Sequence, residues 1–112
     1  MTLILHITLR SHWQTAQQEG AYRADSLGTE GFIHCSTPAQ VVSTANAYYH
    51  GQSGLVLLCI ETDLVESEIR YEAAHGEYFP HLYGSLNLDA VTEVIDFKPD
   101  ADGNFTLPIE LT

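Results

Sequence analysis

Short apolar runs, separated by polar breaks that contain glycine, are the main pattern along this chain. The longest run, Leu55-Val56-Leu57-Leu58-Cys59-Ile60, has no polar interruption. It predicts a strand that is buried on both faces and lies centrally in a sheet. Further strands are predicted over the shorter apolar or alternating runs, at residues 3–7, 31–35, 69–72, 82–86 and 91–97.

Two segments in the first half have the residue types and spacing of helices. Ser11 is a suitable N-cap for a helix over residues 11–18, which Gly20 would end. A second helix is predicted to begin at Ser36 or Thr37, with Pro38 in its first turn. Its apolar face would consist of Val41, Val42, Ala45, Tyr48 and Tyr49.

The remaining segments, including residues 21–30 and 73–80, are predicted to be loops. Helices confined to the first half, followed mostly by strands, indicate the α+β class. We therefore expect a curved or split antiparallel sheet with two N-terminal helices. At 112 residues the chain has the size of a single domain, so we expect residues 1–112 to form one.

The charge balance is strongly acidic and excludes some partners. There are 15 Asp and Glu against 4 Lys and Arg, for a formal net charge of −11. Binding to a phosphate backbone depends on Lys and Arg that displace counterions, so we expect no general binding to nucleic acid or anionic membranes. A small phosphorylated ligand remains open, because helix N–H groups and one or two arginines can hold it.

The sequence contains no positive signal for a particular cellular location or for the use of a cofactor. No segment reaches the roughly 20 apolar residues of a membrane span, and the start lacks the basic region of a signal peptide, so we expect a cytoplasmic protein. The six histidines and two cysteines lack tight ligand spacing, so we predict no metal site and no required cofactor. Cys35 follows His34, but adjacent strand residues point to opposite faces, which indicates a buried thiol.

Two histidines stand in unusual surroundings. His34 lies in Gly31-Phe32-Ile33-His34-Cys35-Ser36-Thr37, and His81 lies in Phe79-Pro80-His81-Leu82-Tyr83-Gly84. Imidazoles among aromatic and aliphatic neighbours are partly desolvated, so a few contacts can tune them for chemistry. The pair predicts a pocket built from separate elements, with His34 and His81 as candidate catalytic groups. Alternatively, both are core histidines bonded to backbone carbonyls.

Two further candidates lie near strand ends. His6 interrupts the first apolar run and is either solvated on an exposed face or aimed into a cleft. Ser36 and Thr37 follow a strand and open the second predicted helix. Their hydroxyls would cap that helix, and its free N–H groups would form a place for an anion.

The segment Arg70-Tyr71-Glu72 sets a cation, an aromatic ring and a carboxylate on consecutive strand positions. Arg70 and Glu72 share a face and could form a surface ion pair. In a pocket, Glu72 would instead act as a general base and Arg70 as an anion clamp. Tyr83 shares a face with His81, and two polar tips on an aromatic segment suggest recognition of a ring or a ribose.

These same motifs resemble DUF952, a family of small bacterial proteins of unknown function. The resemblance covers nearly the whole chain: His6 and Trp13, the segment from Gly31 to Thr37 with Gln40 after it, 70–72 and 79–84. Family members usually have Trp where Tyr71 stands, and often another residue at His6.

The resemblance implies a fold similar to that of ADP-ribosyltransferases, in which a split β-structure grips NAD. By that resemblance His6 would contact a ribose, Ser36 and Thr37 would face the pyrophosphate, and Glu72 would stabilise an oxocarbenium ion. His34 and His81 would line the cleft. Fold alone implies a ligand rather than a reaction.

Three functional hypotheses follow. The first is an ADP-ribosyltransferase-like protein that binds NAD or an ADP-ribose-like nucleotide, with NAD as a candidate substrate and attack at the ribose anomeric carbon. The second is a non-catalytic module that binds a metabolite in the same pocket, which the net charge of −11 favours. The third is a structural protein with buried, satisfied histidines. The sequence leaves the oligomeric state open.

Overall fold

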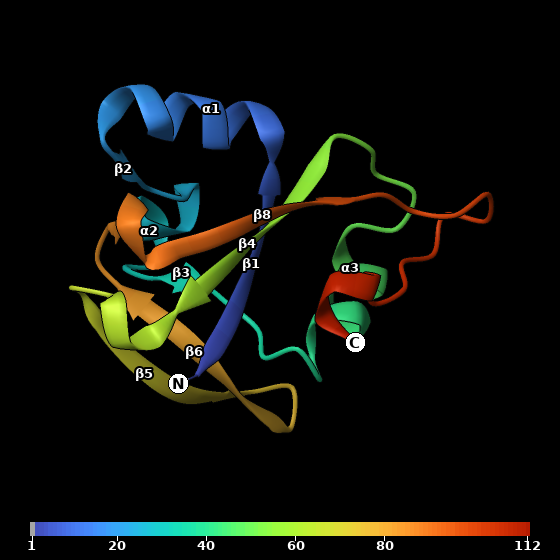
Figure 1. The fold of residues 1–112 in the computed structure, drawn as a ribbon. Helices are drawn as coiled ribbons and strands as arrows, with labels where there is room; N and C mark the ends of the chain where they lie inside the picture. The colour runs from blue at the N-terminus through green and yellow to red at the C-terminus, as the bar shows by residue number, and fades with distance from the viewer. Residues whose placement is uncertain (1) are drawn as a thin grey trace.

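Antiparallel strands dominate the computed structural model, which describes residues 2–112 (Figure 1). The first three-stranded sheet has the order β1 (Leu3–Leu9), β4 (Leu55–Glu61) and β8 (Val91–Phe97). The second has the order β3 (Ile33–His34), β6 (Glu77–Tyr83) and β5 (Glu68–Ala74). A short ribbon pairs β2 (Ala21–Tyr22) with β7 (Leu86–Asn87). The predicted α+β class with antiparallel pairing is confirmed.

Helices are few and short. The α-helices are α1 (Arg10–Glu19), α2 (Asp25–Thr29) and α3 (Val41–Tyr48). Single 3-10 turns are η1 (Thr62–Leu64), η2 (Leu88–Ala90) and η3 (Ile109–Leu111). The loop predicted over 21–30 therefore holds β2 and α2, whose five residues are too few to give a helical pattern in the sequence.

The second predicted helix begins later than expected. Ser36 forms an isolated antiparallel bridge with Leu5, and α3 has Gln40 as its N-cap residue, with no side-chain cap bond. Pairing with β1 keeps the chain extended at Ser36, so the helix cannot start there. The Gln40 side chain instead accepts the Thr37 N–H through Oε1 at 3.0 Å and donates from Nε2 to the Tyr78 carbonyl at 2.8 Å.

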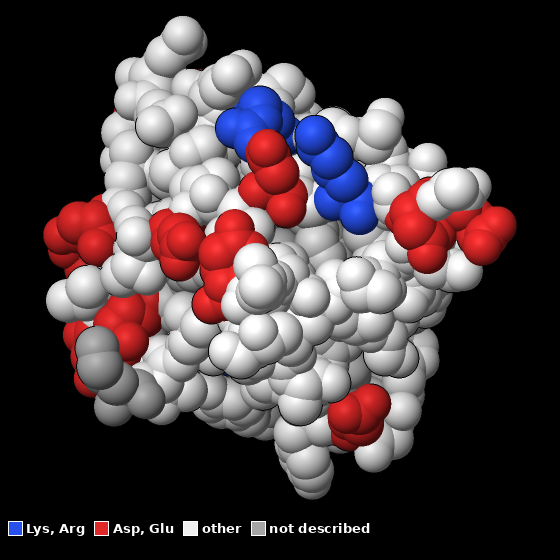
Figure 2. Space-filling model, turned by 45° about the vertical axis from the view of Figure 1, so that its right-hand side comes forward, with Lys and Arg blue, Asp and Glu red and all other residues white. Residues whose placement is uncertain are grey.

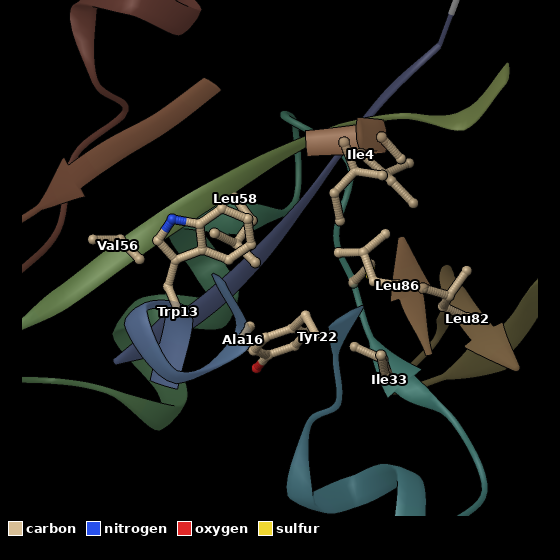
Figure 3. Packing of buried hydrophobic residues seen from close by; sticks show 12 residues of the cluster. Ile4, Trp13, Ala16, Tyr22, Ile33, Val56, Leu58, Leu82 and Leu86 are labelled. Atoms are coloured by element: carbon tan, nitrogen blue, oxygen red, sulfur yellow. The ribbon is translucent and has the colours of Figure 1, made fainter. Parts of the chain in front are cut away.

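Strand β4 is buried on both faces, as its uninterrupted apolar run predicts. One face contributes Val56, Leu58 and Ile60 to a core with Trp13 and Ala16 of α1 (Figure 3). The other face contributes Leu55, Leu57 and Cys59 to a core with Val41 and Ala45 of α3. Alternation along one strand thus fixes which helix covers which face of the first sheet.

The segment predicted as a loop over 73–80 is a β-hairpin. Strand β5 continues to Ala74, and β6 begins at Glu77. The two residues between them have positive φ, 51° at His75 and 81° at Gly76, which is the backbone of a type I′ turn. The prediction failed because His-Gly is a weak turn signal and Pro80 argues against a strand.

Pro80 lies inside β6 without disrupting it. The Cys35 N–H donates to the Pro80 carbonyl at 3.1 Å, but Pro80 has no N–H to return the bond. The ladder between β3 and β6 consequently ends at the pair His34 and His81.

The two three-stranded sheets are joined between β1 and the end of β3. Leu5 and Ser36 exchange backbone hydrogen bonds of 2.7 and 2.8 Å. The His6 imidazole adds a third bond, 2.6 Å from Nδ1 to the His34 carbonyl oxygen. Beyond this joint the strands pair with different partners, since β1 continues along β4 and β3 continues along β6.

The His6 ring is held at both nitrogens. Because a carbonyl only accepts, Nδ1 must donate to His34, and neutral Nε2 then accepts from the Tyr22 hydroxyl at 2.7 Å. Thr8 Oγ1 lies 2.9 Å from the same hydroxyl. Burial lowers the pKa of His6 to about 4, and burial raises the pKa of Tyr22 to about 12, so both groups are neutral near pH 7.

Substitution of Gly84 is expected to destabilise the protein. Gly84 has φ 151°, and a Cβ there would lie 2.4 Å from Ser67 Oγ and 2.9 Å from Ser67 Cβ. Gly84→Ala should lower the free energy of unfolding by about 1 to 3 kcal/mol in urea denaturation. Gly28→Ala is the matched control, because Gly28 lies in α2 with open space around it. Equal stability of both variants would refute this role of Gly84.

Stability should depend on pH through His6. Its pKa is about 4 when folded, against an ordinary 6.5, so the unfolded state takes up the extra proton between these values. The contribution is fully present above pH 6.5 and is lost as pH falls toward 4, by roughly 3 kcal/mol.

Denaturation of wild type and His6→Asn from pH 7.5 to 4 would measure this dependence. The variant should be less stable at neutral pH, and its stability should fall less steeply with acid. His12→Asn, at an exposed histidine of α1, is the control and should keep the wild-type slope. An unchanged slope in His6→Asn would assign the acid sensitivity to other groups.

Candidate functional site

A cleft of about 870 Å³ opens beside the joint between the sheets. It is lined by residues of β1, α2, β3, α3 and β6 and of the β5–β6 turn. The lining side chains used below are Glu30, Phe32, His34, Tyr48, His75 and His81. Separate parts of the sequence thus contribute to one concave site, which is a common property of ligand sites.

His81 is a buried polar group of the cleft whose ring is fixed by two neighbours. It is 6% exposed, and its ring stacks on Phe32 with centroids 4.1 Å apart and an interplanar angle of 18°. Its Nδ1 lies 2.8 Å from Glu72 Oε1. Because a carboxylate only accepts, Nδ1 carries the proton, and Nε2 of the neutral ring keeps its lone pair. An imidazole held in this way is arranged to accept a proton at Nε2.

Glu72 holds His81 from behind the cleft. Its Oε1 also accepts the Tyr83 hydroxyl proton at 2.5 Å. The hydrogen bonds from Tyr83 and then His81 lower the pKa of Glu72, so this carboxylate is ionised, and the Glu72 carboxylate raises the pKa of Tyr83. Neither Glu72 nor Tyr83 is among the described residues that line the cleft. Glu72 contacts the lining residue His81, and the Tyr83 ring lies 5.3 Å from that of the lining residue Phe32.

His34 lies directly across from His81. The two are paired residues of β3 and β6, and their ring centroids are 5.5 Å apart. His34 is about half exposed, and its Nε2 lies 3.0 Å from Glu30 Oε2. The structure therefore brings together the two histidines that the motifs single out, and each has its own carboxylate partner.

Arg70 and Tyr71 do not line the cleft. Arg70 pairs with Glu68 at 2.9 Å instead of with Glu72, and its guanidinium lies 4.3 Å from the centre of the Tyr83 ring. This cation–π contact covers one face of the Tyr83 ring. Tyr71 pairs across the hairpin with Pro80 and, by strand alternation, lies on the face opposite Arg70, about half exposed.

The residues expected to bind ribose and pyrophosphate have protein partners instead. Both His6 ring nitrogens are hydrogen-bonded within the fold, so His6 joins the sheets and has no free atom for a ribose. The Ser36 N–H donates to Leu5, and the Thr37 N–H donates to Gln40 Oε1. These two N–H groups are therefore not available to an anion, and because α3 begins at Val41, the free helix N–H groups expected to hold one lie further along the chain. Ser36 itself lines the cleft.

Cys35 is among the residues that line the cleft, but its side chain is buried. It is 4% exposed and packs in the core with Ile33, on the face of β3 opposite His34. Burial raises the pKa of its thiol to about 12, so it remains protonated near pH 7.

Some site residues were missed by sequence reasoning. Phe32 lies directly before β3 and two residues before His34, so extended chain would place both side chains on one face, which was a usable signal. Glu30 stands four residues before His34, but its contact depends on the bend after α2. Tyr48 and His75 are 27 residues apart and meet only through the tertiary fold, with the Tyr48 hydroxyl 3.0 Å from His75 Nε2.

The cleft is poor in positive charge. Among the described residues that line it, none is Lys or Arg, whereas Asp25 and Glu30 contribute carboxylates. Figure 2 shows a face of the molecule where red Asp and Glu atoms are spread widely and blue Lys and Arg atoms occupy one small area. The cleft therefore offers imidazoles and carboxylates, rather than Lys or Arg side chains, to a ligand.

The described residues contain neither a metal-binding cluster nor a membrane-spanning helix. Within residues 2–112, no three His, Cys, Asp or Glu side chains converge in a way that could hold a metal ion. No helix in that range is both long and apolar enough to cross a membrane.

Comparison with known proteins identifies relatives of this chain. The crystal structure of protein CC0527 from Caulobacter crescentus is 37% identical, covers 98% of each chain and has a TM-score of 0.90. The solution NMR structure of CC0527 is 38% identical, covers 93% of this chain and 91% of that one, and has a TM-score of 0.80. No curated protein matches this chain.

The family model described as "Protein of unknown function (DUF952)" matches residues 7–94. That range contains both histidine motifs and Arg70-Tyr71-Glu72, the segments on which the resemblance was based. The chain belongs to the DUF952 family.

Proposed function

We propose that the cleft binds NAD or an ADP-ribose-like nucleotide through its ribose, and that the protein acts at the ribose anomeric carbon. The observation that carries this proposal is the pair of histidines on adjacent strands, with His81 fixed by Glu72 through Nδ1 and with no hydrogen bond from the described residues 2–112 to its Nε2. Chemistry at an anomeric carbon needs a base for the incoming nucleophile and polar contacts to sugar hydroxyls.

Each group has a role in this reaction. Because Nε2 of His34 donates to the Glu30 carboxylate, its Nδ1 accepts a hydrogen bond from a ribose hydroxyl, and His81 Nε2 takes the proton from an attacking water or hydroxyl. The new C–O bond forms at the anomeric carbon as the C–N bond to the base breaks, and the leaving base keeps the electron pair. Ionised Glu72 stabilises the imidazolium that His81 becomes. Glu72 therefore acts through His81 rather than directly on the developing oxocarbenium ion.

The carboxylates of the cleft favour a ligand that carries positive charge near the reacting carbon. Asp25 and Glu30 both line the cleft, and the pyridinium ring of NAD is a cation bonded to that carbon. Attraction between such charges is strongest where the site excludes water.

An ADP-ribosyltransferase-like fold is proposed on the same basis. Two antiparallel sheets meet at the joint of Leu5 with Ser36 and then separate, and the cleft lies beside that joint. This arrangement agrees with a split β-structure that grips a nucleotide.

A non-catalytic metabolite-binding module is the second candidate. Glu72 Oε1 already accepts two hydrogen bonds, and the described lining residues include no Lys or Arg to hold a pyrophosphate. Both observations suit a pocket that binds a ligand without converting it.

Loss of His34 should weaken nucleotide binding. Ligand-observed NMR with NAD, ADP-ribose and nicotinamide would be run on wild type and His34→Ala, and the samples followed for hours for nicotinamide release. The variant should bind NAD roughly tenfold more weakly, because one hydrogen bond to the ribose is lost. His50→Ala, at another exposed histidine outside the cleft, should bind like wild type. A wild-type protein that binds none of these ligands contradicts the proposal.

Neutralising Glu72 should separate catalysis from binding. Glu72→Gln keeps the shape of the side chain but removes the charge behind His81, so NAD turnover should fall by roughly 10²- to 10⁴-fold. Binding should change only a few fold, because Glu72 does not line the cleft. Ring ¹⁵N shifts of His81 would report whether Nδ1 still carries the proton. Saturable binding with no turnover in wild type would favour the binding module.

A further inference from the structure

Tyr48 and His75 form a second polar aromatic group in the cleft, away from His34 and His81. Tyr48 ends α3, and His75 lies in the β5–β6 turn, six residues before His81. Six residues of nearly extended chain span roughly 15 to 20 Å. Both side chains line the same cleft as the two histidines, so the cleft has two ends with different chemistry.

The Tyr48 ring is held in place although it is exposed. The side chain is 63% exposed, and its hydroxyl lies 3.0 Å from His75 Nε2, with ring centroids 6.2 Å apart at an interplanar angle of 49°. His75 has a φ of 51°, a backbone conformation that is uncommon for a residue other than glycine. An aromatic ring is thus presented to solvent at a fixed angle, where free rotation would otherwise be expected.

A second contact fastens the same turn to α3. The Gln40 amide donates from Nε2 to the Tyr78 carbonyl at 2.8 Å, while its Oε1 accepts the Thr37 N–H at 3.0 Å. The hairpin tip is therefore attached at both the start and the end of α3. Fixing these groups before a ligand arrives lowers the entropy cost of binding.

We infer that Tyr48 and His75 form a second subsite, which stacks a planar, uncharged heterocycle belonging to the same ligand whose ribose lies at His34 and His81. This inference rests on the proposed function for the identity of the ligand. A stacked ring suits the observed groups because Tyr48 offers an aromatic face, and the described lining residues include no Lys or Arg for an anion. Thr44 and Gln52 line the cleft as well and provide a hydroxyl and an amide for the edge of a base.

The separation of the two ends selects the size of the ligand. A mononucleotide would occupy only the histidine end, whereas a dinucleotide with a base at each end would occupy both. Tyr48 should therefore contribute to the affinity for NAD and adenosine, but not to the affinity for nicotinamide mononucleotide.

The test compares dissociation constants of NAD, adenosine and nicotinamide mononucleotide for wild type, Tyr48→Ala and Tyr48→Phe. Loss of one base–aromatic stack should weaken NAD binding by between about fivefold and a hundredfold in Tyr48→Ala. Tyr48→Phe keeps the ring and should lose much less affinity for NAD. Nicotinamide mononucleotide should bind all three proteins equally. Because Tyr48 is exposed, neither substitution threatens folding, and a thermal melt checks this.

The NMR signals of the Tyr48 and His75 rings, together with the dissociation constants, distinguish failure of the subsite from failure of the proposed function. If NAD binds and His34→Ala weakens it, but Tyr48→Ala binds NAD like wild type, the subsite is refuted and the proposed function stands. If NAD fails to bind but adenosine shifts the ring signals of Tyr48 and His75, the subsite stands and the proposed function fails. If adenosine and NAD both leave those ring signals unmoved, the subsite is refuted.

Discussion

The joint between β1 and the end of β3 is the contact on which the arrangement of the two sheets depends. Two backbone hydrogen bonds between Leu5 and Ser36, and the bond from His6 to the His34 carbonyl, hold it together. Each such bond contributes about 1 kcal/mol, and a buried group left without its partner costs more. The buried His6 ring therefore constrains the two groups it bonds, the His34 carbonyl and the Tyr22 hydroxyl. It fixes where the strands separate, and it requires Tyr22 to donate to Nε2.

The proposed function depends on the side chains beside this joint that line the cleft. His34 contributes its carbonyl to the joint and its side chain to the cleft, so a single residue connects the scaffold to the site. Across the ladder His81 is stacked on Phe32 and bonded to Glu72, which leaves its ring few orientations. A site on paired strands is more rigid than one on loops, and a rigid site is what acid–base chemistry requires.

Several candidate residues turned out to act through others. Glu72 reaches the cleft through His81, and Tyr83 contacts Glu72 and the lining residue Phe32. Arg70 covers Tyr83 while pairing with Glu68. Strand alternation placed Arg70 and Glu72 on one face, but the register of the hairpin decided which neighbour each would meet. The free N–H groups of a helix beginning at Ser36 or Thr37 were expected to hold an anion, but α3 begins only at Val41. Pairing with Leu5 and the Gln40 side chain uses the N–H groups of Ser36 and Thr37.

Local sequence patterns were enough to predict the elements whose residues carry a strong signal. The apolar run at 55–60 specified a strand buried on both faces, because every second side chain must face a core on each side. The histidine motifs specified the family and the residues to examine. The tertiary structure alone decided the roles of His6, Glu30, Tyr48 and His75, because their partners lie elsewhere in the chain or across a bend. Such contacts depend on strand register and on the packing of α2 and α3, and neither produces a periodic pattern of residues in the sequence.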